Sequence, residues 1–368
     1  MDPRVKPGDD IREGGQGRRT AGASDTKGDG LATDTPYRKI AVLGAGAWGT
    51  ALAAAARRAG REVVLWARRQ KLAVKIVKTR ENTRYLPGLR LDPEIWVTGD
   101  LDDALVADAL LLVMPAQHLR ELCEQLKGRL RPEQPLVICA KGIEQGSLEL
   151  LSEVLAEVLP GQPQAVLSGP NFAAEVAAGL PAATTLAAQD EALARDLVAA
   201  LGSRAFRPYA SGDPVGAQVG GAVKNVIAIA CGIVAGRKLG DNARAALITR
   251  GLAEVVRLGT ALGAQPETLM GLSGLGDLTL TCGALQSRNY SLGVALGEGR
   301  SLEEILGARH SVTEGVFSAA AVTALAKRHG VEMPISQAVD AVVNRNADLD
   351  QTIAGLLSRP FTTEAAGK

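Results

Sequence analysis

The chain has few aromatic residues, few cysteines and no long uninterrupted apolar run. Aromatic side chains make up 3% of the 368 residues, which argues against a surface that stacks nucleic-acid bases. The four cysteines are scattered without a CxxC pair, so neither a metal site nor a redox pair is expected and reduced thiols are favoured. No apolar run reaches the roughly 18 residues of a membrane span, so no transmembrane helix is expected.

The net charge is also small. The 41 Lys and Arg residues nearly balance the 40 Asp and Glu residues, for a formal charge of +1. Without a strong field of one sign, nucleic acid and anionic membranes are not expected as partners. A small anion remains a candidate ligand, because a local cluster of basic side chains is enough to bind it. The length and the 46% of hydrophobic residues favour two domains with ample cores.

Residues 1–36 differ in composition from the rest of the chain. They are rich in Gly, Asp, Arg, Lys and Thr and nearly empty of large apolar residues, so they cannot offset the entropy cost of ordering. They lack the apolar segment of a secretory signal, and their several Asp residues disfavour a transit peptide. We expect a disordered tail or an upstream start here, and a cytoplasmic protein.

Between residues 37 and 210, short apolar strands alternate with helical stretches. Helices are expected at 50–59, before Gly60, and at 147–159. Buried parallel strands are expected at 40–43, 63–66, 110–114, 136–139 and 165–167. This alternation predicts an α/β fold, with a doubly wound Rossmann-type parallel sheet as the N-terminal domain.

From residue 211 to about 360 the pattern changes to helices without strands. Asp213 followed by Pro214 is a strong helix start, and the apolar run to residue 235 predicts a long buried helix. Further helical signals are a start at residue 241 that continues to about 262, a capping box at Ser301 and Glu304, and helices at 335–343 and 349–357. The C-terminal domain is therefore predicted to be all-α.

A glycine-rich turn, GAGAWG at 44–49, directly follows the first predicted strand and opens a helix. In a dinucleotide site Gly44 permits the tight turn, Gly46 lets the backbone approach the pyrophosphate, and Gly49 permits close helix–strand packing. The helix N-terminus attracts the phosphates. An ordinary strand–helix turn is the alternative, which this context disfavours. The expected cofactor-binding residues here are Gly44, Gly46, Ala47, Trp48 and Gly49.

Two arginines stand where the second predicted strand ends. An NAD enzyme usually places Asp or Glu there to bind the ribose 2′-hydroxyl. Arg68 and Arg69 occupy that place instead, and guanidinium groups suit a 2′-phosphate by charge and by fork geometry. The pair favours NADP(H) over NAD(H), which remains a second candidate. Two solvated arginines at a strand end are the alternative interpretation.

Several charged residues stand in unusual positions. Lys141 follows an apolar strand, at the end where ligands bind in an open α/β sheet. Lys224 interrupts the apolar helix, where an ammonium group is paired, faces a cleft, has a lowered pKa or snorkels to the surface. Asp277 lies in a glycine-containing segment expected to be a flexible loop. Arg288 and Asn289 offer an anion donor beside an amide, or form a surface loop pair.

These motifs, taken in order, resemble the bacterial NAD(P)-dependent glycerol-3-phosphate dehydrogenase family. The resemblance covers residues 39 to about 358, and the N-terminal tail has no counterpart in it. It rests on GAGAWGTALA at 44–53, MPAQHLR at 114–120, AKGIE at 140–144, SGPNFAAEV at 168–176, GGAVKNVIAIACGI at 220–233, SGLGDLTLTC at 273–282, SRN at 287–289 and VTEGV at 312–316.

The resemblance implies a reaction and a set of residue roles. The reaction interconverts sn-glycerol 3-phosphate and dihydroxyacetone phosphate in a homodimer, and it supplies glycerol 3-phosphate for phospholipid synthesis. Lys224 would bind substrate and transfer the proton, Lys141 would contact both cofactor and substrate, and Asp277 would be a substrate ligand that could also hold the ammonium group. Further implied substrate contacts are Gly169, Asn171, Ser287, Arg288 and Asn289; further implied cofactor contacts are Ala173, Arg288, Val312 and Glu314. His118 is not expected to be a catalytic base and is assigned to positioning or to no role.

Two other functions fit parts of the sequence. Another two-domain NADP-dependent reductase, acting on a hydroxy acid or a ketopantoate-like substrate, could use a lysine of the helical domain. A carboxylate substrate and a phosphate substrate would distinguish these two enzymes. A non-enzymatic dinucleotide sensor would need a helix-turn-helix or a basic patch, which the near-neutral charge disfavours.

Overall fold

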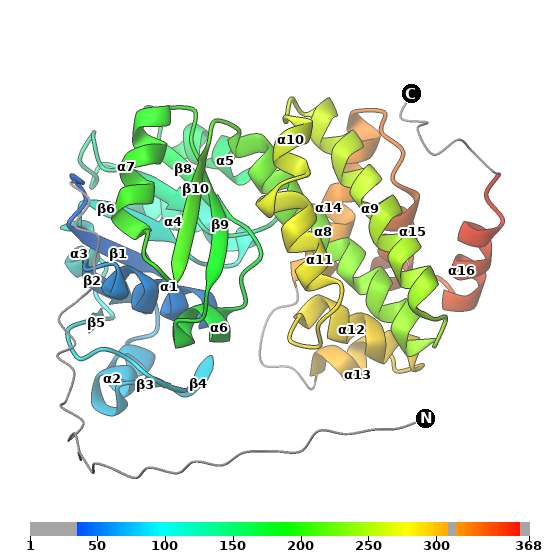
Figure 1. The fold of residues 1–368 in the computed structure, drawn as a ribbon, viewed down its shortest axis with the longest axis horizontal. Coiled ribbons are helices and arrows are strands. Elements are labelled where there is room, and N and C mark those ends of the chain that lie inside the picture. Colours follow the sequence, from blue (N-terminus) through cyan, green and yellow to red (C-terminus); the bar gives the residue numbers. More distant parts are fainter. Residues whose placement is uncertain (1–34, 308–313, 361–368) are drawn as a thin grey trace, which may run out of the picture.

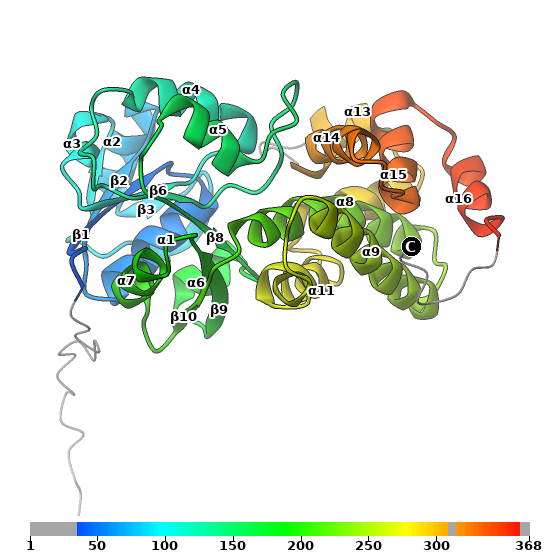
Figure 2. The same ribbon diagram turned by 90° about the horizontal axis from the view of Figure 1, so that it is seen from above.

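A computed structural model describes residues 35–307 and 314–360 of the chain (Figure 1). A sheet with helices on both faces forms one half, and a group of helices forms the other. Figures 1 and 2 show the two halves side by side, with α8 (Pro214–Gly236) reaching the junction. Nearly all of the predicted tail lies outside the described residues, so its disorder stays a prediction.

The first half contains an eight-stranded sheet with the order β10-β9-β8-β7-β6-β1-β2-β5. All neighbouring strands are parallel except β8 and β9, which pair antiparallel. The strands are β1 Lys39–Leu43, β2 Glu62–Trp66, β5 Trp96–Thr98, β6 Ala109–Leu112, β7 Leu136–Ile138, β8 Gln164–Ser168, β9 Ala182–Ala187 and β10 Phe206–Ser211. The predicted Rossmann-type sheet is therefore confirmed as a mostly parallel one. The exception arises because only the short helix α6 (Ala173–Ala178) separates β8 from β9, and the chain returns beside β8 in the opposite direction.

Helices cover both faces of this sheet. Along β1, Ile40 and Val42 join one apolar cluster while Ala41 and Leu43 join the other, as the alternation of side chains along a strand requires. One cluster includes α1 Ala47–Arg58, α6 and α7 Glu191–Leu201; the other includes α3 Asp102–Leu105, α4 Leu119–Leu126 and α5 Leu151–Val158. The remaining elements of this half are α2 Gln70–Thr79, the hairpin strands β3 Glu81–Asn82 and β4 Leu86–Arg90, and the 3-10 turn η1 Ala116–His118.

The predicted helix at 147–159 begins later than expected. Helix α5 starts at Leu151, because Leu150 pairs as an isolated β-bridge with Ile143 and closes a folded loop before the helix. The residues from 147 to 150 therefore belong to that loop, which follows β7.

The described residues of the second half form helices joined by turns and loops, without a strand. Helix α8 starts where the sequence predicted, because Asp213 Oδ1 accepts a hydrogen bond of 2.8 Å from the backbone N–H of Gly216 and Pro214 follows the cap. The predicted capping box is also confirmed, with 3.2 Å bonds in both directions between Ser301 and Glu304. Around α8 lie α9 Asp241–Ala261, α10 Pro266–Leu269, the π-helical turn η2 Leu272–Gly276, α11 Asp277–Thr281, α12 Arg288–Gly297, α13 Leu302–Gly307, α14 Glu314–Arg328, α15 Pro334–Arg345 and α16 Leu349–Leu357.

Helix α8 forms the core of this half. Its length and composition would suit a membrane span, but 83% of its most apolar window is buried inside the protein. Glycines let α12 pack directly on it: a Cβ at Gly232 would lie 2.1 Å from the Tyr290 carbonyl oxygen, and one at Gly293 would lie 2.0 Å from that of Ile229. This close contact fixes the start of α12, with Arg288, beside the α8 turn that carries Lys224.

Candidate active site

The glycine-rich turn between β1 and α1 has the geometry of a dinucleotide site. Gly44 has a φ of +129°, and a Cβ there would lie 2.0 Å from the Val113 carbonyl oxygen. A Cβ at Gly49 would lie 1.8 Å from the Gly44 carbonyl oxygen, whereas one at Gly46 would meet nothing within 4 Å. Gly44 and Gly49 are thus required by packing, and Gly46 leaves room for a ligand over the turn.

The start of α1 supplies polar groups to this turn. Ala47 and Trp48 are its first residues, where free backbone N–H groups favour an anion. The indole Nε1 of Trp48 is buried and has no hydrogen-bond partner among the described residues. Ala173 is the first residue of the short helix α6, and it packs against the same apolar cluster of the sheet half as Ala47 and Trp48. These residues fit the diphosphate of a nicotinamide dinucleotide.

Asn82 supports the turn from β3, and sequence reasoning missed it. Its side-chain Nδ2 donates to the Ala45 carbonyl oxygen at 2.9 Å and to Thr50 Oγ1 at 2.8 Å. The residue is fully buried. No local pattern marks Asn82, because both partners lie more than 30 residues earlier in the chain.

Arg68 and Arg69 lie just after β2, as expected. Both are exposed, and Arg69 precedes the first residue of α2. Strand β2 pairs with β1, and its last residue, Trp66, is in register with Leu43. Both arginines therefore follow the strand next to the glycine-rich turn, where a dinucleotide presents its adenosine ribose.

The centre of the candidate site is a carboxylate between two ammonium groups. Lys224 Nζ lies 2.7 Å from Asp277 Oδ1, and Lys141 Nζ lies 2.5 Å from Asp277 Oδ2. Lys141 also donates to the Gly169 carbonyl oxygen at 3.0 Å. The structure therefore brings Lys141, Asp277 and Lys224 together from three separate stretches of sequence.

Burial and mutual attraction set the ionisation of this cluster. Burial lowers the pKa of Lys224 to about 8, with the nearby Lys141 cation acting in the same direction and Asp277 opposing both. Burial alone would raise the pKa of Asp277, but the Lys141 and Lys224 ammonium groups outweigh it and hold that pKa below its ordinary value. Asp277 is therefore an anion, and Lys224 can lose and regain a proton near neutral pH.

The expectation of a flexible loop around Asp277 is wrong. The segment forms the π-helical turn η2, and Asp277 is the first residue of α11. The glycines serve close packing: a Cβ at Gly274 would lie 1.8 Å from the Leu269 carbonyl oxygen, and one at Gly220 would lie 2.4 Å from that of Ser273. The carboxylate is consequently held rigidly against α8.

Thr281 is a member of the site that sequence reasoning left unassigned. Lys224 Nζ donates to Thr281 Oγ1 at 2.8 Å, and that hydroxyl lies 3.3 Å from Asp277 Oδ1. Thr281 stands four residues after Asp277 on α11, so both face the same side of the helix. Helical spacing from Asp277 could have found it, had the segment been predicted as a helix.

The predicted anion site lies at the start of α12. Ser287 caps the helix by accepting a 3.2 Å hydrogen bond from the Tyr290 N–H, and Arg288 is its first residue. Desolvation by the surrounding protein lowers the pKa of Arg288, against the opposing effect of Glu314, although the residue as a whole is exposed. Asn289 is buried, and the pair opens helix α12, so the alternative of a loop pair is excluded.

The side chain of Asn289 binds other residues of the protein, which differs from the expected contact with substrate. Its Nδ2 donates to Asn225 Oδ1 at 2.8 Å, and its Oδ1 accepts from the Gly315 N–H at 2.9 Å. Both ends of the amide are thus engaged within the protein. Asn289 joins α12 to α8 and to the first turn of α14.

Asn171 offers the clearest unpartnered polar group. Both amide atoms of its side chain are buried without a hydrogen-bond partner in the described part of the chain. It lies two residues after Gly169, whose carbonyl oxygen accepts from Lys141. A buried amide in this position fits a contact with a polar ligand.

Glu314 opens α14 at the junction of the two halves. Burial raises the pKa of Glu314 to about 7, while Arg288 and a hydrogen bond from the Ala116 backbone act in the opposite direction. The other predicted residue of this motif, Val312, lies outside the described residues. His118 is half-exposed and pairs only with Glu121 among the described residues, at 3.5 Å.

A doubly wound sheet with a glycine-rich turn, joined to a helical half that buries a lysine–carboxylate cluster, defines a nicotinamide-dependent oxidoreductase. Residues 39–194 match the family model described as the NAD-dependent glycerol-3-phosphate dehydrogenase N-terminus, and residues 213–354 match that of the C-terminus. The chain belongs to the NAD(P)-dependent glycerol-3-phosphate dehydrogenase family.

Similar proteins agree with this assignment. The chain is 61% identical to a glycerol-3-phosphate dehydrogenase (NAD(P)+) of Parvibaculum lavamentivorans, over 89% of this chain and 98% of that protein. It is 58% identical to the one of Rhodospirillum rubrum, over 89% and 95% respectively. The crystal structure of glycerol-3-phosphate dehydrogenase from Coxiella burnetii is 41% identical and matches with a TM-score of 0.84, over 88% of this chain and 99% of that one.

Proposed function

We propose that the chain reduces dihydroxyacetone phosphate to sn-glycerol 3-phosphate, and catalyses the reverse reaction, with Lys224 as the proton-transfer residue. The observation that carries this proposal is the Lys224–Asp277–Lys141 cluster, in which a carboxylate that is 1% exposed is held between two ammonium groups. Membership of the family supports the choice of substrate.

Each residue of the cluster has a separate role in proton transfer. The reduced nicotinamide, when bound, supplies the hydride to the substrate carbonyl carbon. Lys224 has three N–H donors, of which Asp277 and Thr281 take two. The third stabilises the negative charge that develops on the carbonyl oxygen and then transfers its proton there. With a pKa of about 8, the neutral amine is accessible for the reverse reaction.

Lys141 supports the same oxygen from the sheet half. It too spends two of its three donors within the protein, on Asp277 and on the Gly169 carbonyl oxygen. Its positive charge lowers the pKa of Lys224, which eases proton release. Asp277 stays ionised and orients both ammonium groups.

We further propose that Arg288 and the N-terminus of α12 bind the substrate phosphate. A guanidinium group and free backbone N–H groups at a helix start both favour a phosphate dianion. Because the Asn289 side chain is engaged on both ends, Asn289 would contact substrate through its backbone N–H. The unpartnered Asn171 amide would bind a substrate hydroxyl.

We also propose NADP(H) as the preferred cofactor, with NAD(H) as a second one. The support is the pair of exposed arginines after β2, in place of an acidic residue. Glu314 would contact the cofactor from the helical half, and Val312 stays a predicted cofactor contact.

Strand β10 ends at Ser211 and α8 begins at Pro214, which supports the division into domains at 37–210 and 211–360. A cytoplasmic homodimer that supplies glycerol 3-phosphate for phospholipids is the physiological form that we propose.

One assay tests the activity directly. Purified protein is mixed with NADPH or with NADH, and oxidation is followed after adding dihydroxyacetone phosphate. We expect turnover with both cofactors, and a larger kcat/KM with NADPH. Ketopantoate, which carries a carboxylate in place of the phosphate, is the comparison substrate. Turnover of ketopantoate without turnover of dihydroxyacetone phosphate would contradict the proposal.

A further inference from the structure

The loop between β7 and α5, residues 139–150, carries Lys141 at its start and is folded back on itself. Ile143 and Leu150 pair as an antiparallel bridge. The Glu144 N–H donates to the Glu149 carbonyl oxygen at 3.0 Å, and the Leu148 N–H donates to the Glu144 carbonyl oxygen at 3.1 Å. The loop is thus a compact unit, and a shift of Glu144 would move the backbone that carries Lys141.

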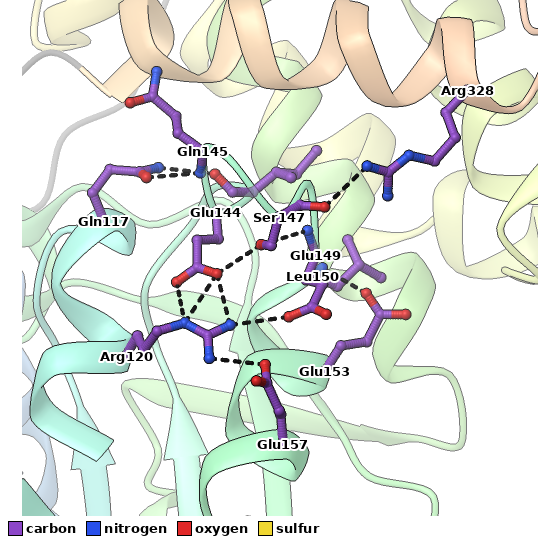
Figure 3. A network of polar contacts seen from close by, with 11 residues as sticks. Gln117, Arg120, Glu144, Gln145, Ser147, Glu149, Leu150, Glu153, Glu157 and Arg328 are labelled. Atoms are coloured by element: carbon purple, nitrogen blue, oxygen red, sulfur yellow. Dashed lines mark hydrogen bonds and ion pairs between the residues drawn. The ribbon is translucent and has the colours of Figure 1, made fainter. Parts of the chain in front are cut away.

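Arg120, on α4, binds the carboxylate groups of this loop (Figure 3). Its guanidinium binds Glu144 bidentately, with Nε 2.9 Å from Oε1 and one terminal nitrogen 2.8 Å from Oε2. The same nitrogen lies 3.1 Å from Glu149, and the other lies 2.8 Å from Glu157 on α5. The hydrogen bonds from Arg120 also hold the pKa of Glu144 below its ordinary value.

Gln117 in η1 holds the backbone on either side of Glu144. Its Nε2 donates to the Ile143 carbonyl oxygen at 2.8 Å, and its Oε1 accepts from the Gln145 N–H at 2.9 Å. Gly142 lies against the same turn, because a Cβ there would be 2.7 Å from the Ala116 Cβ. The segment that follows Lys141 is therefore held on one side by η1 and α4.

The opposite side of the loop contacts the helical half. Arg328 on α14 donates to the Ser147 carbonyl oxygen at 3.1 Å (Figure 3). The side-chain Nε2 of Gln145 lies 3.5 Å from the Phe317 carbonyl oxygen, also on α14. The loop therefore lies between the two halves, with Lys141 at the end that reaches Asp277.

We infer that Arg120 is a positioning residue for the reaction, which acts on Lys141 through Glu144 and the folded loop. Without the guanidinium, three carboxylates would face one another, and their repulsion would open the loop. Lys141 would then move away from Asp277. This inference rests on the proposed role of Lys141 and adds that the position of Lys141 depends on a residue of α4 whose guanidinium binds carboxylates of the loop and of α5.

Three single variants test the inference in the full-length protein with dihydroxyacetone phosphate and NADPH. Arg120→Met removes the guanidinium, and Glu144→Gln keeps the shape of the loop side chain while removing its charge. The matched control is Glu157→Gln, which removes an ion pair of 2.8 Å to the same arginine from α5 rather than from the loop. Glu157 is 58% exposed, against 13% for Glu144.

We expect the two loop-loosening variants to lose about 10- to 100-fold in kcat, the size of effect that a misplacement of about 1 Å produces. The pH–rate profile should also change: the pKa assigned to Lys224 should rise, because the Lys141 cation that helps to lower it has moved. Glu157→Gln should stay within about twofold of wild type, as surface substitutions usually do. Melting temperatures, measured by circular dichroism, identify a loss of activity that comes from unfolding; Glu144→Gln decides the question if Arg120→Met does not fold.

A double-mutant cycle separates positioning from a general structural role. In a Lys141→Met background, Glu144→Gln should cause little further loss of kcat, because its effect passes through a side chain that is no longer there. Additive losses, or an unchanged pH profile, would overturn the inference. Full activity of Lys141→Met would overturn it as well, while turnover of dihydroxyacetone phosphate by the wild-type protein would leave the proposed reaction intact.

Discussion

Replacing Lys224 by Met tests the proposed proton transfer with the least change of shape. The thioether side chain fills nearly the same space as the lysine stem and removes only the ammonium group. Acid–base help of this kind is worth about 10²- to 10⁴-fold in rate, so kcat for dihydroxyacetone phosphate should fall by at least that range. Cofactor affinity should be retained, because the glycine-rich turn at 44–49 lies in the sheet half.

The same substitution has a calculable effect on stability. The pKa of Lys224 falls from 10.5 to about 8 on folding, and at about 1.4 kcal/mol per unit the charged form costs the fold about 3 kcal/mol at pH 7. Since that pKa already includes the attraction to Asp277, removing the charge relieves up to this amount. Thr281 then loses one of its two hydrogen-bond partners and keeps Asp277, at a cost of about 1–3 kcal/mol. The variant should therefore melt no lower than wild type.

The assay measures the initial rate of NADPH oxidation at saturating dihydroxyacetone phosphate, with thermal melting and NADPH fluorescence titration alongside. Lys327→Met, an exposed lysine on α14, is the matched control and should change neither kcat nor melting temperature. A folded Lys224→Met protein that keeps more than about a tenth of wild-type turnover would refute the assignment, because general acid–base help exceeds that factor.

Three further predictions follow from the site. In the direction of reduction, kcat should fall as the pH rises through about 8, the pKa of Lys224, because the protonated amine is needed. In the direction of oxidation, kcat should rise over the same pH interval. The same pH dependence of kcat in Lys224→Met would contradict this prediction. The Arg68→Ala, Arg69→Ala double variant should bind NADPH about 10- to 100-fold more weakly, the worth of a charge-assisted pair, whereas equal losses for NADH would remove the 2′-phosphate assignment. Arg288→Lys should raise KM for dihydroxyacetone phosphate because the planar fork is lost; the same proportional loss with unphosphorylated dihydroxyacetone would make Arg288 structural.

The sequence was most informative where local composition alone determines structure. Strands β1, β2, β6, β7 and β8 are short apolar runs that are buried on both faces, and all five were predicted. Strand β9, AATTLA, lacks large apolar side chains except one, and β10, FRPYAS, contains a proline and exposed positions. Strand β5 has only three residues. Strands β5, β9 and β10 form because a neighbouring strand pairs with each of them, and no local sequence pattern predicts that pairing.

Some residues of the candidate site could likewise be predicted from local sequence, and others could not. Lys224 and Lys141 could be found because a charge beside apolar residues needs an explanation. Thr281 was missed, because helical spacing from Asp277 points to it only if the segment is predicted as a helix, and its contact with Lys224 spans 57 positions. The segment before Asp277 was predicted as a loop because glycine permits flexibility, yet its glycines serve close packing against α8 and α10. Composition alone does not separate these two uses of glycine.

Asp277 links the chemistry of the two halves. Lys224 approaches it from α8 of the helical half, and Lys141 approaches it from the loop after β7 of the sheet half. The charge of Lys141 is one of the causes that lower the pKa of Lys224. If the halves separated, Lys224 would lose that repulsion and gain water, and both changes would raise its pKa. The amine would then hold its proton more firmly, so the pKa of the proposed proton-transfer residue suits catalysis only while the two halves are in contact at Asp277.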